Sequence, residues 1–359
     1  MKLFTVGPVE MFENIKEMGK DQIPYFRNAY FSDVMKELDY NLKTLFHMSP
    51  NDKNIFLTAS GTGAMEAVVM NCLSEKDKVL VISGGGFGER FEELCRIHNI
   101  PYEVLRIPYG ESFCEEALKK LEQKEYTAML VNIHETSIGQ LYPITILSEF
   151  CQKKQMMFIV DAISSAFADE IDFSEYAIDV MIYSSQKALA LAPGISVVAL
   201  KESVVKNRIG QNMHSMYFDF SAYLENMERG QTPFTPAIGI LLQMHIMVKE
   251  LVQMGLEKKV AYTNFIAEDF RKKLQKAHFK MPDYPLSNAL TPILFKGDAE
   301  VYYRKLIEDY DITVNPCGGK LKSEMLRVGH MGNLKVEDND LLIDALCRIR
   351  REKKYGNEE

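Results

Sequence analysis

The sequence lacks low-complexity segments, internal repeats and any excess of positive charge. Its 42 lysines and arginines are outnumbered by 50 aspartates and glutamates, which leaves a net charge of −8 at pH 7. This balance does not favour nucleic acid or an anionic membrane surface as a partner. The apolar runs fall short of the roughly 20 residues that a membrane-spanning helix needs, and the N-terminal apolar stretch is too short for a secretory signal. We therefore expect no binding to nucleic acid or membranes.

Paired cysteines are also missing. The six cysteines are scattered and form no C-x-x-C pair: Cys72, Cys95, Cys114, Cys151, Cys317 and Cys347. This spacing argues against a zinc ribbon and against a disulfide framework. Reduced thiols are the simple interpretation, so the sequence predicts a cytoplasmic protein without a metal site.

The glycine-rich stretch after residue 83 lacks one residue that a dinucleotide site needs. Glycines at 84–86 and 88 follow an apolar run, but the third glycine of G-x-G-x-x-G would fall at position 89, where Glu89 stands. That glycine permits close helix–strand packing, so its absence argues against a dinucleotide site. The glycines instead allow the backbone to lie flat beneath the ring of a ligand, and Phe87 would stack on that ring.

The chain does contain a large supply of core residues, since 47% of its 359 residues are hydrophobic. From residue 54 onward, short apolar runs alternate with helical patterns. Seven runs are expected to be strands: 55–58, 78–83, 102–105, 128–133, 156–160, 180–182 and 195–200. Helices are expected at 32–46, with Ser32 as N-cap, and at 238–254. From about residue 255 the pattern predicts an α+β unit, with helices at 257–277, 299–309 and 337–351 and strands at 291–295, 312–315 and 325–328.

Lys187 lies in a connection between two predicted buried strands, among small and hydroxyl residues. A lysine there is costly to desolvate unless its amine is neutralised or bonded, and a Schiff base to an aldehyde cofactor achieves both. A lone lysine is more often a surface residue with a buried stem, so the interpretation depends on Asp161. Asp161 stands 187 − 161 = 26 residues upstream, at the end of a predicted strand. Parallel sheets place ligand-contacting groups there, and a carboxylate would keep a pyridine ring protonated.

The segments 160–165 (VDAISS) and 185–189 (SQKAL) together resemble the class V group of fold-type I pyridoxal-phosphate enzymes. That group includes alanine–glyoxylate, serine–pyruvate, 2-aminoethylphosphonate–pyruvate and phosphoserine aminotransferases. The resemblance spans nearly the whole chain. It implies an α/β fold with a mostly parallel seven-stranded sheet in a large domain (21–250), an N-terminal segment (1–20) and a small α+β domain (251–359). It also implies a homodimer with shared active sites.

The resemblance assigns catalysis to Lys187 and Asp161 and implies pyridoxal 5′-phosphate as cofactor. A glycine-bearing loop that opens a helix offers N–H groups to a phosphate, although an ordinary capped helix start has the same pattern. The implied cofactor-binding residues are Ser60, Gly61, Thr62, Phe87, Thr136, Asp161, Ile163, Gln186, Lys187, Gln231 and Thr235. Phe87 would stack on the ring, and Thr136 would bond its hydroxyl side. One of Gln231, Thr232 and Thr235 would reach the phosphate of the other subunit, and which one is left open.

Arg327 and Gly7 are the implied substrate-binding residues. Arg327 ends a predicted strand before a glycine, which suits a bidentate grip on a carboxylate, although a lone arginine is usually a surface residue. Gly7 and Pro8 make a plain turn or, by the resemblance, cross the active-site mouth near that carboxylate.

The predicted activity is transfer of an amino group from a small amino acid or amine, such as alanine, serine or 2-aminoethylphosphonate, to a 2-oxo acid such as pyruvate or glyoxylate. A lyase of the same superfamily, such as a cysteine desulfurase, is the alternative, with Cys317 as its nucleophile. Phe87 counts against it, because desulfurases typically carry histidine there. A non-catalytic binding protein on the same fold is the third possibility, against which the intact Lys187 and Asp161 argue.

Overall fold

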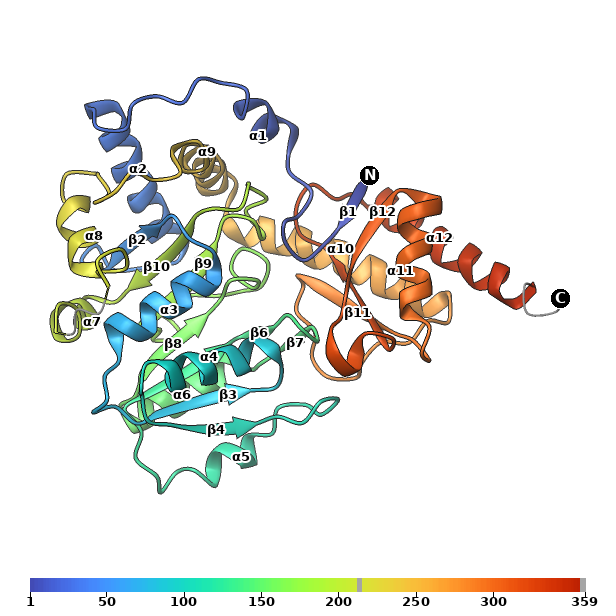
Figure 1. Cartoon of the computed structure of the whole chain (residues 1–359), viewed down its shortest axis with the longest axis horizontal. Helices are drawn as coiled ribbons and strands as arrows, with labels where there is room; N and C mark the ends of the chain where they lie inside the picture. Colours follow the sequence, from blue (N-terminus) through green and yellow to red (C-terminus); the bar gives the residue numbers. More distant parts are fainter. Residues whose placement is uncertain (212–214, 356–359) are drawn as a thin grey trace.

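The computed structural model describes residues 1–211 and 215–355. Two sheets organise the chain, a seven-stranded one and a four-stranded one, joined along the molecule by helix α10 (Leu256–Lys276) (Figure 1). Within the described residues, no helix combines the length and the apolar character needed to cross a membrane.

The large sheet has the strand order β2-β10-β9-β8-β5-β3-β4. Its strands are β2 (Lys53–Leu57), β3 (Val79–Ser83), β4 (Tyr102–Arg106), β5 (Ala128–Asn132), β8 (Met157–Asp161), β9 (Val180–Ser184) and β10 (Ser196–Leu200). All seven predicted strands are present, and the mostly parallel sheet is confirmed. Only β10 runs antiparallel to its neighbours β2 and β9. The connection 185–195 is too short for a crossover helix, so the chain turns straight back.

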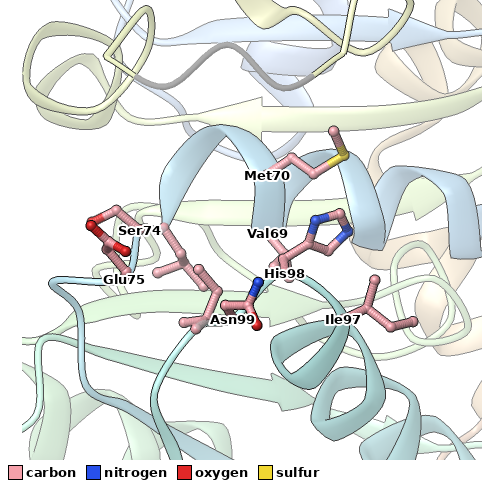
Figure 2. A pocket seen from close by; sticks show the side chains of 9 residues that line it. Val69, Met70, Ser74, Glu75, Ile97, His98 and Asn99 are labelled. Atoms are coloured by element: carbon pink, nitrogen blue, oxygen red, sulfur yellow. The ribbon is translucent and has the colours of Figure 1, made fainter.

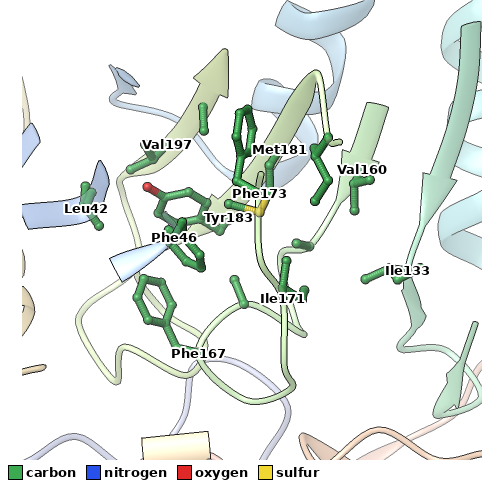
Figure 3. Packing of buried hydrophobic residues seen from close by; sticks show 14 of the residues in the cluster. Leu42, Phe46, Ile133, Val160, Phe167, Ile171, Phe173, Met181, Tyr183 and Val197 are labelled. Atoms are coloured by element: carbon green, nitrogen blue, oxygen red, sulfur yellow. The ribbon is translucent and has the colours of Figure 1, made fainter. Parts of the chain in front are cut away.

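Helices cover both faces of this sheet, so the strands carry apolar residues on both sides. In β3, Leu80 and Ile82 join one core cluster, whereas Val79 and Val81 join the other. The first cluster includes α2 (Ala29–Leu45) and α9 (Ile238–Met254), and the second includes α3 (Gly61–Cys72) and α4 (Gly86–Ile97). Figure 3 shows the aromatic centre of the first cluster, where the Tyr183 ring lies 5.2 Å from that of Phe46. This packing fixes the end of β9, which lies three residues before Lys187.

The start of α2 was predicted incorrectly. The helix begins at Ala29, and Asn28 is its N-cap, because the Asn28 side chain accepts a hydrogen bond from the Phe31 backbone N–H. Asparagine caps helices as well as serine does. Ser32 instead lies in the first turn, where its hydroxyl accepts a hydrogen bond from Gln231.

The small sheet has the order β1-β12-β13-β11, with β1 (Lys2–Phe4), β11 (Leu290–Leu294), β12 (Ile312–Pro316) and β13 (Met325–Gly329). Helices α10, α11 (Ala299–Tyr310) and α12 (Val336–Tyr355) pack on it around a core of its own. The strand β1 pairs in parallel with β12, so the chain's first residues complete a sheet built mainly from its last third. The smaller elements are α1 (Glu13–Met18), α5 (Glu115–Lys119), β6 (His134–Glu135), β7 (Gln140–Leu141), α6 (Ile144–Lys154), α7 (Glu202–Asn207), α8 (Phe220–Met227) and the 3-10 helix η1 (Gly319–Leu321).

Candidate active site

The predicted catalytic residues meet at the carboxyl edge of the large sheet. Asp161 is the last residue of β8, and Lys187 follows the end of the adjacent strand β9. Ligands of open α/β sheets bind at this edge. The N-termini of α3 and α4 lie at the same edge, because each helix follows a parallel strand of the sheet.

Lys187 is held by the N-terminal segment. Its Nζ donates a hydrogen bond to the Val6 carbonyl oxygen at 2.8 Å. A Cβ at Gly7 would lie only 2.8 Å from that Nζ, and Gly7 has a φ of +136°, so only glycine lets the segment cross the amine. The Val6 N–H in turn donates to Asn315 Oδ1 at 2.6 Å, which anchors the segment to β12. The structure thus brings Gly7 and Lys187 together.

The environment of Lys187 favours its uncharged form. Burial lowers the pKa of Lys187 to about 8, an effect that the nearby Asp161 carboxylate opposes and that Arg327 and Arg90 reinforce. An amine with this pKa is partly unprotonated near neutral pH, as a nucleophilic lysine requires. The sequence alone predicted that burying the Lys187 amine would be costly. The structure shows the buried surroundings that cause this cost.

Asp161 is a buried carboxylate without a charged partner. It is 5% exposed, and its Oδ1 accepts the Ile163 backbone N–H at 2.8 Å. Burial raises the pKa of Asp161 to about 7, against the opposing effect of that N–H. Among the described residues no lysine or arginine forms an ion pair with it. A site of this kind fits a ligand that brings its own positive charge, such as a protonated pyridine nitrogen.

Ile163 also touches the predicted phosphate loop. A Cβ at Gly61 would lie 2.5 Å from Ile163 Cδ1, so the start of α3 packs directly on this side chain. Ser60 caps α3, because its hydroxyl accepts the Gly63 N–H at 3.3 Å. The N-terminus of this helix therefore opens next to Ile163 and supplies backbone donors and a positive dipole end for an anion.

Arg90 was not predicted, yet it joins two predicted cofactor residues. Its Nη1 donates to Thr62 Oγ1 at 3.0 Å, and its guanidinium lies 4.8 Å from the centre of the Phe87 ring. Arg90 follows Phe87 by three residues, so the two side chains share one face of α4. That spacing was the available signal in the sequence. The arrangement adds a positive charge beside the phosphate loop.

Glu135 positions the backbone of Phe87 from a separate segment. Its fully buried carboxylate accepts the N–H groups of Phe87 at 3.2 Å and Gly88 at 3.1 Å. Gly85, the N-cap of α4, has no side chain for this purpose, so Glu135 supplies the acceptors. Asn132 Nδ2 donates to the same carboxylate at 3.0 Å. The end of β5 and the start of α4 are therefore fixed relative to one another.

Arg327 connects the small sheet to the Thr136 loop. Its Nη1 donates to the Thr136 carbonyl at 2.9 Å, and its Nη2 donates to the Pro316 carbonyl at 2.7 Å. Its Nε is buried and has no partner within the described residues. A buried donor of this kind is costly unless a ligand satisfies it. The guanidinium is thus fixed by two backbone carbonyls and retains a free donor.

The loop predicted to reach the other subunit is only partly available for that role. Gln231 is buried, and its Nε2 donates to Ser32 Oγ at 2.7 Å and to the Phe26 carbonyl at 3.0 Å. Thr232 Oγ1 donates to the Phe234 carbonyl at 2.7 Å. Thr235, by contrast, is exposed. Gln186 is half-buried beside Lys187, but no described hydrogen bond joins the 231–235 loop to Lys187, Asp161 or the start of α3.

Cys317, on which a lyase would depend, is buried just after β12 near Arg327. Burial raises the pKa of its thiol, and Arg327 acts in the opposite direction. Figure 2 shows a cleft between the C-terminal ends of α3 and α4, lined by Val69, Met70, Leu73, Ser74, Glu75, Ile97, His98, Asn99 and Ile100. It lies at the opposite ends of these helices from Ser60 and Phe87, and it contains none of the predicted site residues.

Comparisons with known proteins agree with this geometry. Residues 24–314 match the family model "Aminotransferase class-V". The soluble hydrogenase small subunit of Synechococcus is 28% identical to the chain, over 99% of the chain and 94% of that protein. The 2-aminoethylphosphonate–pyruvate transaminase of Lysinibacillus sphaericus is 26% identical, over 97% and 96%. The crystal structure of an alanine–glyoxylate aminotransferase from Nostoc superposes with a TM-score of 0.90 at 23% identity, covering 97% of this chain and 94% of that one.

The match covers most of the chain, and the sheet, its helices and the small α+β unit are those of the fold-type I enzymes. The predictions of the fold, of pyridoxal phosphate as cofactor and of an aminotransferase rather than a lyase or a binding protein are thereby confirmed. The chain belongs to the aminotransferase class-V family and is a pyridoxal-phosphate-dependent aminotransferase.

Proposed function

We propose that this enzyme moves an amino group from a small amino acid or amine, such as alanine, serine or 2-aminoethylphosphonate, to a 2-oxo acid such as pyruvate or glyoxylate. The observation that carries the proposal is the placement of Lys187, a half-buried residue whose amine donates to the Val6 carbonyl beside Gly7 and lies near the unpaired Asp161 carboxylate. Relatives named for glyoxylate or pyruvate support the choice of acceptor.

Each residue has a role that its surroundings explain. Pyridoxal phosphate, when bound, supplies an aldehyde and an electron-withdrawing ring. Lys187 Nζ would hold the aldehyde and carry a proton at its nitrogen, because burial keeps its pKa near 8. Asp161 would keep the ring nitrogen protonated. Ser60, Gly61, Thr62 and Gln186 would bind the phosphate, while Phe87 and Ile163 would enclose the ring.

The proposed substrates can be tested directly. The purified holoenzyme is mixed with single amino donors, and the loss of its visible absorbance identifies the donors that react. Acceptors are then identified by its recovery with pyruvate, glyoxylate and 2-oxoglutarate. We expect alanine, serine or 2-aminoethylphosphonate as donor and a two- or three-carbon acceptor. Reaction with aspartate and 2-oxoglutarate alone would overturn this choice of substrates and leave the aminotransferase assignment intact.

Arg327 is proposed to bind the substrate carboxylate through its unpartnered Nε and one Nη. A guanidinium offers two parallel donors to a carboxylate, whereas lysine offers a point charge. Loss of one charge-assisted bond costs roughly 1.5–3 kcal/mol, or about 10- to 150-fold in affinity. We therefore expect Arg327→Lys to raise KM for amino and keto acids by about this factor, with the absorbance of the bound cofactor unchanged.

Steady-state kinetics with donor and acceptor varied in turn measure this effect. Arg106→Lys is a suitable control, because Arg106 pairs with Glu92 at 2.7 Å and is not one of the predicted site residues. The control should keep both KM values. Equal KM values for the wild type and Arg327→Lys would show that the carboxylate is bound elsewhere. If the amine carries a phosphonate instead, the defect should persist in the keto-acid half-reaction.

We also propose a symmetric homodimer in which Thr235 reaches the cofactor phosphate of the other subunit. The side chains of Gln231 and Thr232 are bonded within their own chain, which leaves Thr235 as the available hydroxyl. Large exposed aromatic residues near this loop, Tyr25 (70% exposed) and Tyr30 (59%), support an interface there. A two-fold axis would form the shared site twice.

Sedimentation and subunit mixing test the dimer. We expect a dimer at assay concentrations, and mixing inactive Lys187→Ala with Thr235→Ala should restore part of the activity, because one site of the mixed dimer is then intact. A fully active monomer would contradict the proposal. The proposal would also be contradicted if mixing restored no activity although the subunits were shown to exchange.

The remaining proposals concern organisation and location. A large cofactor domain at 21–250 and a small domain at 251–359 are supported by the two sheets and their separate cores. A cytoplasmic location is supported by the cysteines, all of which are unpaired in the described chain.

A further inference from the structure

A chain of three side chains leads away from the cofactor site to a buried histidine. Thr136 Oγ1 is hydrogen-bonded to Ser164 Oγ, and Ser164 Oγ lies 3.0 Å from His134 Nδ1. All three residues are buried, and His134 is only 2% exposed. His134 Nε2 is buried and unpartnered within the described residues. The chain therefore ends at a histidine that makes a single side-chain hydrogen bond.

That single bond determines which nitrogen of His134 carries the proton. If Nε2 carried it, a buried N–H would be left without an acceptor, and such orphan donors are rarer in proteins than orphan acceptors. With the proton on Nδ1, His134 donates to Ser164, and only a lone pair on Nε2 is left unmatched. Ser164 can then donate onward to Thr136. Among the described residues, the Thr136 hydroxyl hydrogen then has the His134 carbonyl oxygen as its acceptor at 3.3 Å, a long bond that a closer acceptor on the cofactor would replace.

His134 remains uncharged while it donates this hydrogen bond to Ser164. Burial lowers the pKa of His134 to about 3, and the positive charges of Lys187, Arg271 and Arg327 around it act in the same direction. Within the described residues, the only side-chain hydrogen bond of the His134 ring joins Nδ1 to the Ser164 hydroxyl. Because the ring is uncharged near neutral pH, the direction of the chain stays constant there.

We propose that His134 is a positioning residue that turns the Thr136 hydroxyl into a hydrogen-bond donor to the ring oxygen of pyridoxal phosphate. This inference rests on the proposed placement of Thr136 beside the ring hydroxyl. A donor to that oxygen draws off part of its negative charge, so the oxygen attracts the proton on the lysine-bound nitrogen less strongly. The pH at which the bound cofactor loses this proton is thereby lowered.

A spectrophotometric pH titration of the holoenzyme measures that midpoint without turnover. His134→Phe keeps the ring volume but removes the donor, and the midpoint should rise by roughly 0.4–1 pH unit, the equivalent of one net hydrogen bond. His134→Asn retains an N–H near the Nδ1 position and should keep the wild-type midpoint. Ser164→Ala breaks the chain with a smaller change in volume and should reproduce the rise even if His134→Phe folds poorly.

His330 provides a matched control. It is equally buried, lies 2.7 Å from the hydroxyl of Thr291 and also has one unpartnered ring nitrogen, but it touches no predicted cofactor residue. His330→Phe should leave the midpoint unchanged. An unchanged midpoint in both His134→Phe and Ser164→Ala overturns the inference, as does an equal rise in His134→Asn or His330→Phe. Wild-type protein that binds no pyridoxal phosphate at Lys187 would instead overturn the site assignment, and with it this inference.

Discussion

Replacing Lys187 with alanine is expected to give a protein without the visible absorbance of a lysine-bound cofactor and without measurable turnover. The amine is the nucleophile that holds the aldehyde and the group that moves the proton, so both functions disappear together. A general acid–base group alone contributes roughly 10²- to 10⁴-fold, and we expect the loss to exceed that range. Absorbance spectra and donor-dependent turnover measure the two effects.

Lys259 is the matched control for this experiment. Burial lowers the pKa of Lys259 to about 8, as it does for Lys187, and its ammonium lies 5.9 Å from the centre of the Phe12 ring. Lys259→Ala should keep both the visible absorbance and the turnover. Lys259 is buried like Lys187, but it lacks the Asp161 carboxylate and the α3 N-terminus that would position a cofactor. Borohydride reduction followed by peptide mapping should label Lys187, and label on any other lysine would contradict the central assignment.

Asp161→Asn should retain the cofactor but lose activity by orders of magnitude. The neutral amide cannot stabilise a protonated ring nitrogen, so the ring withdraws electrons poorly, while the phosphate-binding residues are unchanged. Turnover and cofactor affinity should therefore separate in this variant. Near-normal turnover would remove Asp161 from the mechanism.

The same substitution should stabilise the protein when it is free of cofactor. The pKa of Asp161 is raised from 3.8 to about 7 in the folded state, so its proton stabilises the fold below pH 4, and this contribution is lost as the pH rises to 7. An asparagine does not titrate. Cofactor-free Asp161→Asn should accordingly match the wild type in thermal unfolding at pH 4, exceed it increasingly towards pH 7, and keep that advantage above pH 7. Added pyridoxal phosphate should reduce the difference, because it gives the wild-type carboxylate a cation.

The strands and the catalytic pair could be predicted because their signals are local. A buried strand is a short apolar run, and Asp161 and Lys187 each follow such a run directly. The order of the motifs then identified the family. The helix at 238–254 was also predicted to the residue, since its apolar periodicity begins after Pro236 and ends at Gly255.

Contacts between distant segments could not be predicted in this way. Nothing near Glu135 in the sequence indicates that its carboxylate caps α4, and nothing near Val6 indicates that its carbonyl accepts a hydrogen bond from Lys187. Gln231 is a further example, because its side chain donates hydrogen bonds to the Phe26 carbonyl and the Ser32 hydroxyl instead of facing solvent. These contacts depend on how the elements pack, which local composition does not encode.

The pairing of β1 with β12 also dictates the order in which the protein can be completed during synthesis. Residues 2–4 leave the ribosome well before their partners, residues 312–314. At a synthesis rate of roughly 5–20 residues per second, β12 is completed roughly 15–60 s after β1. Until then the Val6 carbonyl has no strand to hold it over Lys187, so a nascent chain that has already folded its large sheet still lacks a finished catalytic centre.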